Sequence, residues 1–156
     1  MKVNPRLFIG PISKNVVDAT IDEANYMQDY LCLIPSRRQI DFNNGYVNNW
    51  RTNDFVSYVN SRSNKVLIQR DHGGPSQGEL DDDGLDSIIK DSKNNFFLIH
   101  IDPWKKYSKL EEAVNSTIFL IRSCCQINSN VFFEVGTEEA ISCLLYTSDA
   151  ADDRMR

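Results

Sequence analysis

Short apolar runs alternate with amphipathic stretches along most of the chain. Each run is only a few residues long and almost uniformly apolar, which is typical of strands covered by helices. Between the runs, apolar residues recur at spacings of three and four, as they do on one face of a helix. This repeated order of strand and helix predicts an α/β fold with a parallel sheet. The predicted strands are Leu7–Ile12, Tyr30–Ile34, Lys65–Gln69, Phe96–Ile101 and Val131–Val135.

The helices between these strands are predicted from one-sided apolar spacing. The first begins after Ile12, and its apolar face consists of Val17, Thr20, Ile21, Ala24 and Met27. The second is capped by Thr52 and carries Phe55, Val56 and Val59. The third follows the acidic run Asp81–Asp83, which suits a solvated helix start. The fourth helix has the most regular apolar face. A further helix is expected to begin near residues 137–140. The apolar face of the fourth helix consists of Leu110, Ala113, Val114, Thr117, Ile118 and Ile121.

Residues 143–156 do not continue this alternation. They resemble the in-frame translation of a transposase-type sequencing adapter; the alternative is a natural polar C-terminal tail. On the first interpretation, residues 1–142 are one partial barrel domain and residues 143–156 are a non-native read-through tail. Such a tail is left out of reasoning about the fold.

Composition places the chain among ordinary globular proteins, with 41% hydrophobic and 25% charged residues. Its 17 basic and 22 acidic residues give a net charge of −5, so we expect no nucleic-acid partner. The longest apolar runs fall far short of the ~20 residues of a membrane span, and the N-terminus has no signal-like pattern. We therefore expect no membrane association and a cytoplasmic location. The four cysteines have no CxxC spacing, which favours reduced thiols.

Polar side chains gather where the predicted strands end. In a parallel α/β barrel these ends converge on one rim, where active sites are built. Carboxylate and imidazole groups together suit a divalent metal, which polarises a carbonyl and stabilises an enediolate while a nearby carboxylate moves the proton. The candidates are Ser36, Arg37 and Arg38 after the second strand, Asp71 and His72 after the third, His100 and Asp102 at the end of the fourth, and Glu134 within the fifth.

Each candidate also has a plain structural role open to it. Short polar side chains stabilise turns, histidines hydrogen-bond the backbone, and a carboxylate beside apolar residues needs a partner when buried. The alternatives are turn capping for Asp71, core packing for His72 and His100, a solvated surface pair for Arg37 and Arg38, and an ion pair to a neighbouring strand for Glu134.

Several short segments also occur in an order that resembles a known family. They are Ser36 to Gln39, Gly45 and Tyr46, Asp54 and Phe55, Asp71 to Pro75, Ile99 to Asp102, and Glu134 to Glu138. Together they resemble the first half of the tagatose-bisphosphate aldolase accessory-subunit family, in the class II aldolase superfamily. The resemblance covers roughly residues 31–140, and the Asp-His-x-Gly-Pro pattern is its most specific element. It implies the N-terminal part of a TIM (β/α)8 barrel, about five β/α units, so we expect the barrel to be incomplete in this chain.

The resemblance further implies roles for single residues. Asp71 matches a proton-transferring aspartate, His72 a zinc-binding histidine, and Glu134 the glutamate of a Glu-x-Gly motif. Further zinc histidines of the superfamily come from later strands, and the triplet at residues 36–38 is larger and more basic than its counterpart. The resulting expectations are Asp71 and Asp102 as catalytic residues, Ser36, Arg37, Arg38 and His100 as substrate-binding residues, and His72 and Glu134 as zinc ligands.

The implied function lies in carbohydrate metabolism. It is that of a zinc-dependent, class II aldolase-like protein that acts on phosphorylated ketoses of the tagatose-bisphosphate type, as an enzyme or as an accessory subunit. Two alternatives remain: a non-catalytic subunit that stabilises a separate aldolase, or an isomerase or lyase on the same barrel with His100 and Asp102 as its acid/base pair. The expected partners are a phosphorylated sugar and a catalytic aldolase subunit, and the full-length protein is expected to be oligomeric.

Overall fold

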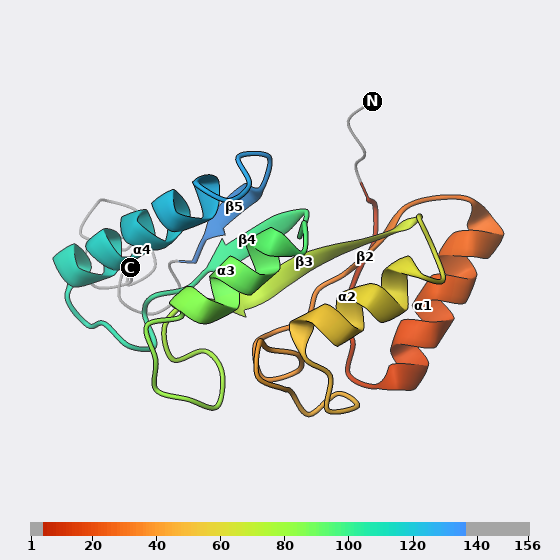
Figure 1. The fold of residues 1–156 in the computed structure, drawn as a ribbon, viewed down its shortest axis with the longest axis horizontal. Helices are drawn as coiled ribbons and strands as arrows, with labels where there is room; N and C mark the ends of the chain where they lie inside the picture. Colours follow the sequence, from red (N-terminus) through yellow and green to blue (C-terminus); the bar gives the residue numbers. More distant parts are fainter. Residues whose placement is uncertain (1–4, 137–156) are drawn as a thin grey trace, which may run out of the picture.

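The five predicted strands form one parallel sheet. The computed structural model describes residues 5–136, and within them every strand pairs with its neighbour in sequence, in the order β1-β2-β3-β4-β5 (Figure 1). The strands are shorter than predicted, with one exception. They are β1 (Phe8–Ile9), β2 (Leu31–Leu33), β3 (Val66–Gly73), β4 (Leu98–Ile101) and β5 (Phe132–Val135).

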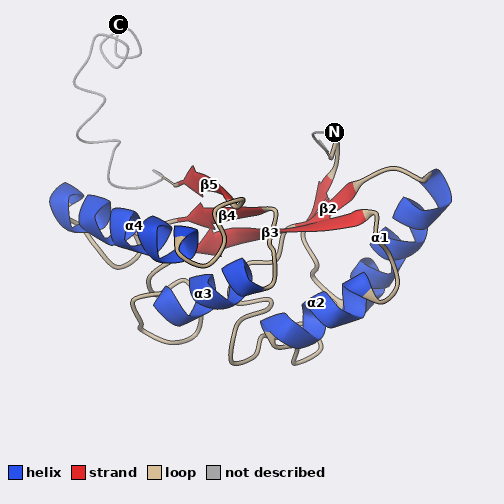
Figure 2. Cartoon of the chain, turned by 45° about the horizontal axis from the view of Figure 1, so that its top comes forward, coloured by secondary structure: helices blue, strands red, loops and turns tan. Residues whose placement is uncertain are grey.

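One helix connects each strand to the next: α1 (Lys14–Met27), α2 (Thr52–Asn60), α3 (Leu85–Lys93) and α4 (Leu110–Cys125). Right-handed crossovers between consecutive neighbours put every connecting helix on the same side of the sheet. Figure 2 shows α2 and α3 together beneath the sheet, with α1 and α4 flanking them. Consecutive strand order with helices on one side is the wall of a β/α barrel, which confirms the predicted α/β class and partial barrel architecture.

The core lies between the sheet and the helices, and it contains most of the positions that the spacing predicted. On α1 the fully buried side chains are Val17, Ile21 and Ala24, and on α2 they include Phe55 and Val59. The hydroxyl oxygen of Ser13 accepts a hydrogen bond from the Val16 N–H and caps α1. None of the helices among residues 5–136 is both long enough and apolar enough to cross a membrane.

The predicted apolar face of α4 is only partly correct. Ala113 and Thr117 are buried as expected, but Val114 and Ile118 are 44% and 42% exposed, and Leu120 is buried instead. The reason is that β5 is the last strand in the described part of the sheet. The side of α4 beyond it has no neighbouring β/α unit there to pack against.

The sequence predicts that the third strand ends at Gln69, which is wrong. The strand continues to Gly73, and its register against β4 shifts between Arg70 and Gly73. His72 adopts a left-handed backbone conformation, with φ of 42°. Successive residues of a regular strand point to opposite faces, whereas a bulge can turn two neighbours toward one side. The bulge therefore explains how Asp71 and His72 line the same cavity.

A buried ion pair joins β3 to the helix layer. Arg70 and Asp91 have fully buried side chains, and Nε and Nη2 of Arg70 each donate to the Asp91 carboxylate at 2.7 Å. Nη1 of Arg70 donates to the carbonyls of Pro35 and Ile40, at 3.0 and 2.7 Å. This single side chain thereby ties the loop after β2, the strand β3 and the helix α3 together behind the site.

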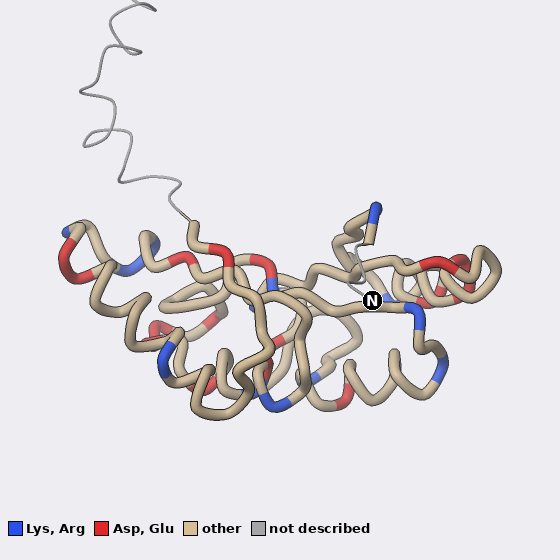
Figure 3. The backbone as a smooth tube through the Cα atoms, turned by 90° about the horizontal axis from the view of Figure 1, so that it is seen from above, with Lys and Arg blue, Asp and Glu red and all other residues tan. Residues whose placement is uncertain are grey.

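Charged residues are interspersed along the described chain. Figure 3 shows Lys and Arg alternating with Asp and Glu over its length, without a broad basic stretch. The helix expected near residues 137–140 and the suspected tail at residues 143–156 lie outside the described residues.

Candidate functional site

The candidate site lies where β2, β3 and β4 end. Ser36 forms a parallel bridge with Asp71, which brings the loop after β2 next to the bulge of β3. A cavity of about 390 Å³ opens at this point. It is lined by Ser36, Arg38, Gln39, Asp71, His72, Gln77 and Lys105.

Three potential metal ligands meet at this edge of the sheet. One ligand atom from each of Asp71, His72 and His100 lies within 4.8 Å of the other two. Oδ1 of Asp71 is 3.7 Å from Nδ1 of His100 and 4.0 Å from Nε2 of His72. The structure therefore groups His100, expected as a substrate-binding residue, with the metal-ligating types.

Asp102 fixes the orientation of His72. Its Oδ2 lies 3.3 Å from Nδ1 of His72, and its Oδ1 accepts a hydrogen bond from the backbone N–H of Trp104 at 3.1 Å. The backbone N–H of Asp102 in turn donates to the Gly73 carbonyl at 2.8 Å. With Nδ1 held by Asp102, Nε2 of His72 is the nitrogen that faces Asp71. Asp102 thus contacts His72, while His100 lies beside Asp71, and the charge of Asp102 also helps to raise the pKa of His100.

Asp71 and His100 shift each other's titration in opposite directions. The contact with His100, at 3.7 Å from its Nδ1 to Oδ1 of Asp71, lowers the pKa of Asp71 below its usual value, against the opposing effect of burial. The same contact raises the pKa of His100. The Nε2 atom of His100 is buried and has no partner among the described residues. It lies against Gly136, where a Cβ would approach it to 2.5 Å, so only glycine leaves room for this ring.

Glu134 is not part of this ligand group. It is the register neighbour of His100 across β4 and β5, and its charge contributes to the raised pKa of His100. Its side chain is exposed, and the described residues give it no ion pair, so the expectation of a buried, paired glutamate is wrong. The physical reason is again the position of β5 at the edge of the described sheet. The structure does not bring Glu134 together with His72.

The adjacent arginines have different environments. Arg37 is 1% exposed, and its Nε donates to Asp41 at 2.9 Å. Its Nη1 and Nη2 donate to both carboxylate oxygens of Asp82, at 2.8 and 2.6 Å, and Nη1 also donates to the Gly74 carbonyl at 2.6 Å. These contacts occupy the guanidinium, so Arg37 supports the loops instead of binding substrate as predicted. Arg38 is exposed and lines the cavity.

The structure also corrects the interpretation of the acidic run before α3. Asp81 and Asp83 are exposed, as a solvated helix start predicts, but Asp82 is half-buried against Arg37. Its Oδ1 also accepts a hydrogen bond from the Gly84 N–H at 3.0 Å. Asp82 therefore connects the loop after β2 to the loop after β3.

Comparison with known proteins identifies a structural neighbour. No protein-family model matches the chain, and neither does any curated protein sequence. Among solved structures, the chain is similar to the crystal structure of a probable tagatose 6 phosphate kinase from Sinorhizobium meliloti 1021, with a TM-score of 0.69 and 16% identity. The match covers 92% of this chain and 42% of that one, so the chain spans less than half the length of its neighbour. The likeness shows a shared fold.

Three residues that line the cavity, Gln39, Gln77 and Lys105, were not among the candidates, and the last two belong to none of the segments singled out in the sequence. Gln77 is buried, and its Nε2 donates to the Asp102 carbonyl at 3.1 Å. Lys105 reaches the cavity from the loop after β4. Neither residue belongs to a spacing pattern, but Lys105 follows Asp102 closely, and its place after a strand end is the one signal that could have identified it.

Proposed function

We propose that this chain carries the metal-binding half of a zinc-dependent, class II aldolase-like lyase that acts on phosphorylated ketoses. The observation that carries the proposal is the grouping of Asp71, His72 and His100 at the carboxyl ends of two strands, with Asp102 behind His72. The resemblance of the Asp-His-x-Gly-Pro segment supports the same reaction class. The fold shared with a probable tagatose 6 phosphate kinase supports a role in carbohydrate metabolism.

The two histidines fit a zinc ion by type and by position. Zinc takes imidazole nitrogens at roughly 2.0–2.1 Å. One nitrogen of His72, one nitrogen of His100 and an oxygen of Asp71 lie within 4.8 Å of one another. Metal-binding histidines also donate their second ring N–H to a carboxylate, which is the arrangement of His72 and Asp102. The two imidazoles would hold the ion, and Asp71 beside them would stay free of the metal and able to move the proton.

Each residue then has a distinct task in carbon–carbon bond cleavage. A bound zinc ion supplies Lewis-acid stabilisation of an enediolate. The Asp71 carboxylate is 36% exposed and lines the cavity, and its lowered pKa keeps it ionised at neutral pH, so it can accept a proton from a substrate. His100 would hold the ion together with His72. Asp102 holds the ring of His72 so that its Nε2 faces the site.

Zinc binding by the chain tests this proposal directly. We expect one zinc ion per chain in an equilibrium titration against a chromogenic chelator. Asp102→Asn is expected to weaken zinc binding by about 10–100-fold, because it loosens the orientation of His72 without removing a ligand. Its urea unfolding midpoint should stay near that of the unmodified chain, which separates loss of positioning from loss of fold.

The matched control is Asp86→Asn, which makes the same change on the exposed first turn of α3. It should bind zinc like the unmodified chain. A chain that binds no zinc, or equal zinc affinity for both variants, would contradict the proposed site.

A further inference from the structure

Two basic side chains that form no ion pair among the described residues line the candidate cavity. Arg38 and Lys105 both border the cavity that contains Asp71 and His72. Both are exposed, and within residues 5–136 neither side chain makes a hydrogen bond or an ion pair. They come from different loops, one after β2 and one after β4, so folding alone places them at the same cavity.

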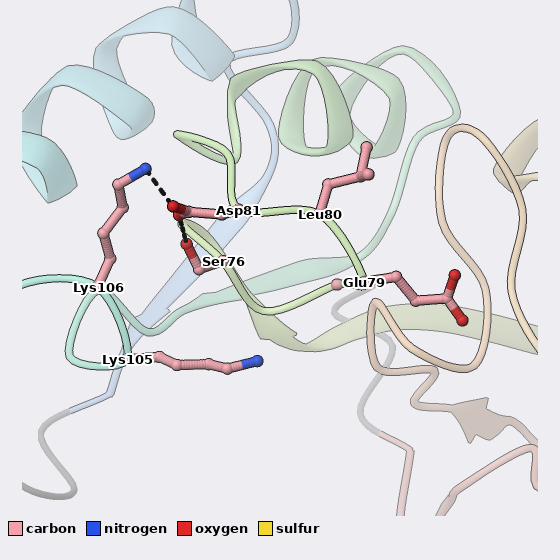
Figure 4. Close-up of a pocket in the computed structure, with 7 residues that line it drawn as sticks. Ser76, Glu79, Leu80, Asp81, Lys105 and Lys106 are labelled. Atoms are coloured by element: carbon pink, nitrogen blue, oxygen red, sulfur yellow. Dashed lines mark hydrogen bonds and ion pairs between the residues drawn. The ribbon is translucent and has the colours of Figure 1, made fainter.

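The basic residues next to them in sequence do have acidic partners. Arg37 is fully engaged by Asp41 and Asp82. Lys106 donates to Oδ1 of Asp81 at 3.1 Å, as Figure 4 shows, and to the Asp82 carbonyl at 2.9 Å. Lys105 makes no such contact in the same view. In a chain with 22 acidic and 17 basic residues, acidic partners are abundant, yet none in the described part forms an ion pair with these two cations.

The two cations disfavour each other in the absence of a ligand. Partial burial, followed by the positive charges of Arg38 and Arg37, lowers the pKa of Lys105. An anion bound between them would remove this repulsion and would gain charge-assisted hydrogen bonds. A guanidinium offers paired N–H donors to a phosphate, and an ammonium adds a point charge, so the two side chains together suit a group with several anionic oxygens.

We propose that Arg38 and Lys105 form an anion subsite that binds the phosphate group of a phosphorylated ligand beside the Asp71 and His72 cluster. The identity of the remaining ligand as a sugar rests on the proposed function. Ser36 borders the same cavity and provides a hydroxyl donor. The subsite makes Arg38 and Lys105 the residues that select a phosphorylated ligand over a neutral one.

The cavity leaves room for the rest of such a ligand. Lys105 also borders a second hollow of about 560 Å³, which is lined in addition by Ser76, Glu79 and Asp81 (Figure 4). Lys105 therefore stands where the two hollows meet. A phosphate held at this junction leaves the hollow of about 390 Å³, with Asp71 and His72 in its wall, for the carbon chain of the ligand.

The test measures phosphate binding by the metal-free chain, so that it does not depend on zinc. Inorganic phosphate is titrated at low ionic strength while backbone amide shifts are followed by NMR. Lys105→Gln and Arg38→Gln are each expected to weaken phosphate binding by about 10–100-fold, the loss typical of a hydrogen bond to a charged group. Both residues are exposed, so the unfolding midpoints of these variants should not change.

Lys106→Gln is the matched control, because it removes the same charge one residue further along. It should bind phosphate like the unmodified chain, since Lys106 is already paired with Asp81. Equal phosphate affinity in all three variants, or none in the unmodified chain, would overturn the subsite.

Two further ligands distinguish a substrate phosphate from free phosphate. Glycerol 3-phosphate should bind at least as tightly as inorganic phosphate and compete with it, whereas glycerol should not bind. Binding of inorganic phosphate alone would overturn the assignment to a phosphorylated ligand. If the unmodified chain binds phosphate but not zinc, only the proposed function is refuted. If it binds zinc but not phosphate, only the subsite is refuted.

Discussion

Arg70→Met is expected to lower the free energy of unfolding by about 3–5 kcal/mol, the cost of leaving a buried charge without its partner. Asp91 is fully buried, and this variant removes both hydrogen bonds that its carboxylate receives from Arg70. The carbonyls of Pro35 and Ile40 lose a donor at the same time. Urea unfolding followed by circular dichroism measures the loss.

Two further variants separate the buried pair from general effects of losing an arginine. Arg62→Met removes an arginine from the exposed contacts with Asp18 and Asp22 and should cost much less, because water screens such pairs. The double variant Arg70→Met with Asp91→Leu should recover much of the loss, since it leaves no unpaired charge. An equal decrease in the free energy of unfolding in the Arg62 and Arg70 variants would refute the proposed role of the buried pair.

The fold could be predicted from the sequence because its determinants are local. Apolar spacing identified the helix faces of Val17 and Ile21 or of Phe55 and Val59, and short apolar runs identified the strands. The Arg70–Asp91 pair was missed because an arginine in an apolar strand and an aspartate in a polar helix end carry no signal that they meet. The one indication was that Asp91 lies three residues after Ile88, a spacing that puts both on the same, buried side of α3.

The candidate site was predicted in part for a similar reason. Parallel strands end at one edge, so Asp71, His72 and His100 were expected near each other without any knowledge of distances. Their detailed arrangement depends on the bulge in β3, where the register against β4 shifts between Arg70 and Gly73. The strand continues to Gly73, beyond its predicted end at Gln69.

Some residues have environments that the sequence did not predict, because those environments depend on contacts between distant segments of the chain. Arg37 is occupied by Asp82, which lies in the loop before α3, and this contact leaves Arg38 as the arginine that lines the cavity. For Glu134 an ion pair to a neighbouring strand was the structural alternative, but its side chain is exposed because β5 lies at the edge of the described sheet. Such environments follow from the assembled sheet and cannot be inferred from local spacing.

Asp71→Asn is expected to slow proton transfer by about 10²–10⁴-fold while zinc stays bound. Asparagine keeps the shape of the side chain and a hydrogen-bond-accepting oxygen, but it cannot take up the proton as a base. The readout is the exchange of a hydroxymethyl proton of dihydroxyacetone phosphate with D₂O, followed by NMR with the zinc-loaded chain. Zinc content is measured on the same samples, so that loss of the base is distinguished from loss of the metal.

His72→Ala gives the complementary result, because it removes a ligand instead of the base. Zinc binding and proton exchange should both be lost, whereas Asp86→Asn, an exposed aspartate on α3, should retain both. Exchange at the normal rate in Asp71→Asn would exclude Asp71 as the base. Zinc bound by the unmodified chain without any exchange would instead favour the accessory-subunit alternative, in which the site is retained for its structure and a separate catalytic subunit moves the proton.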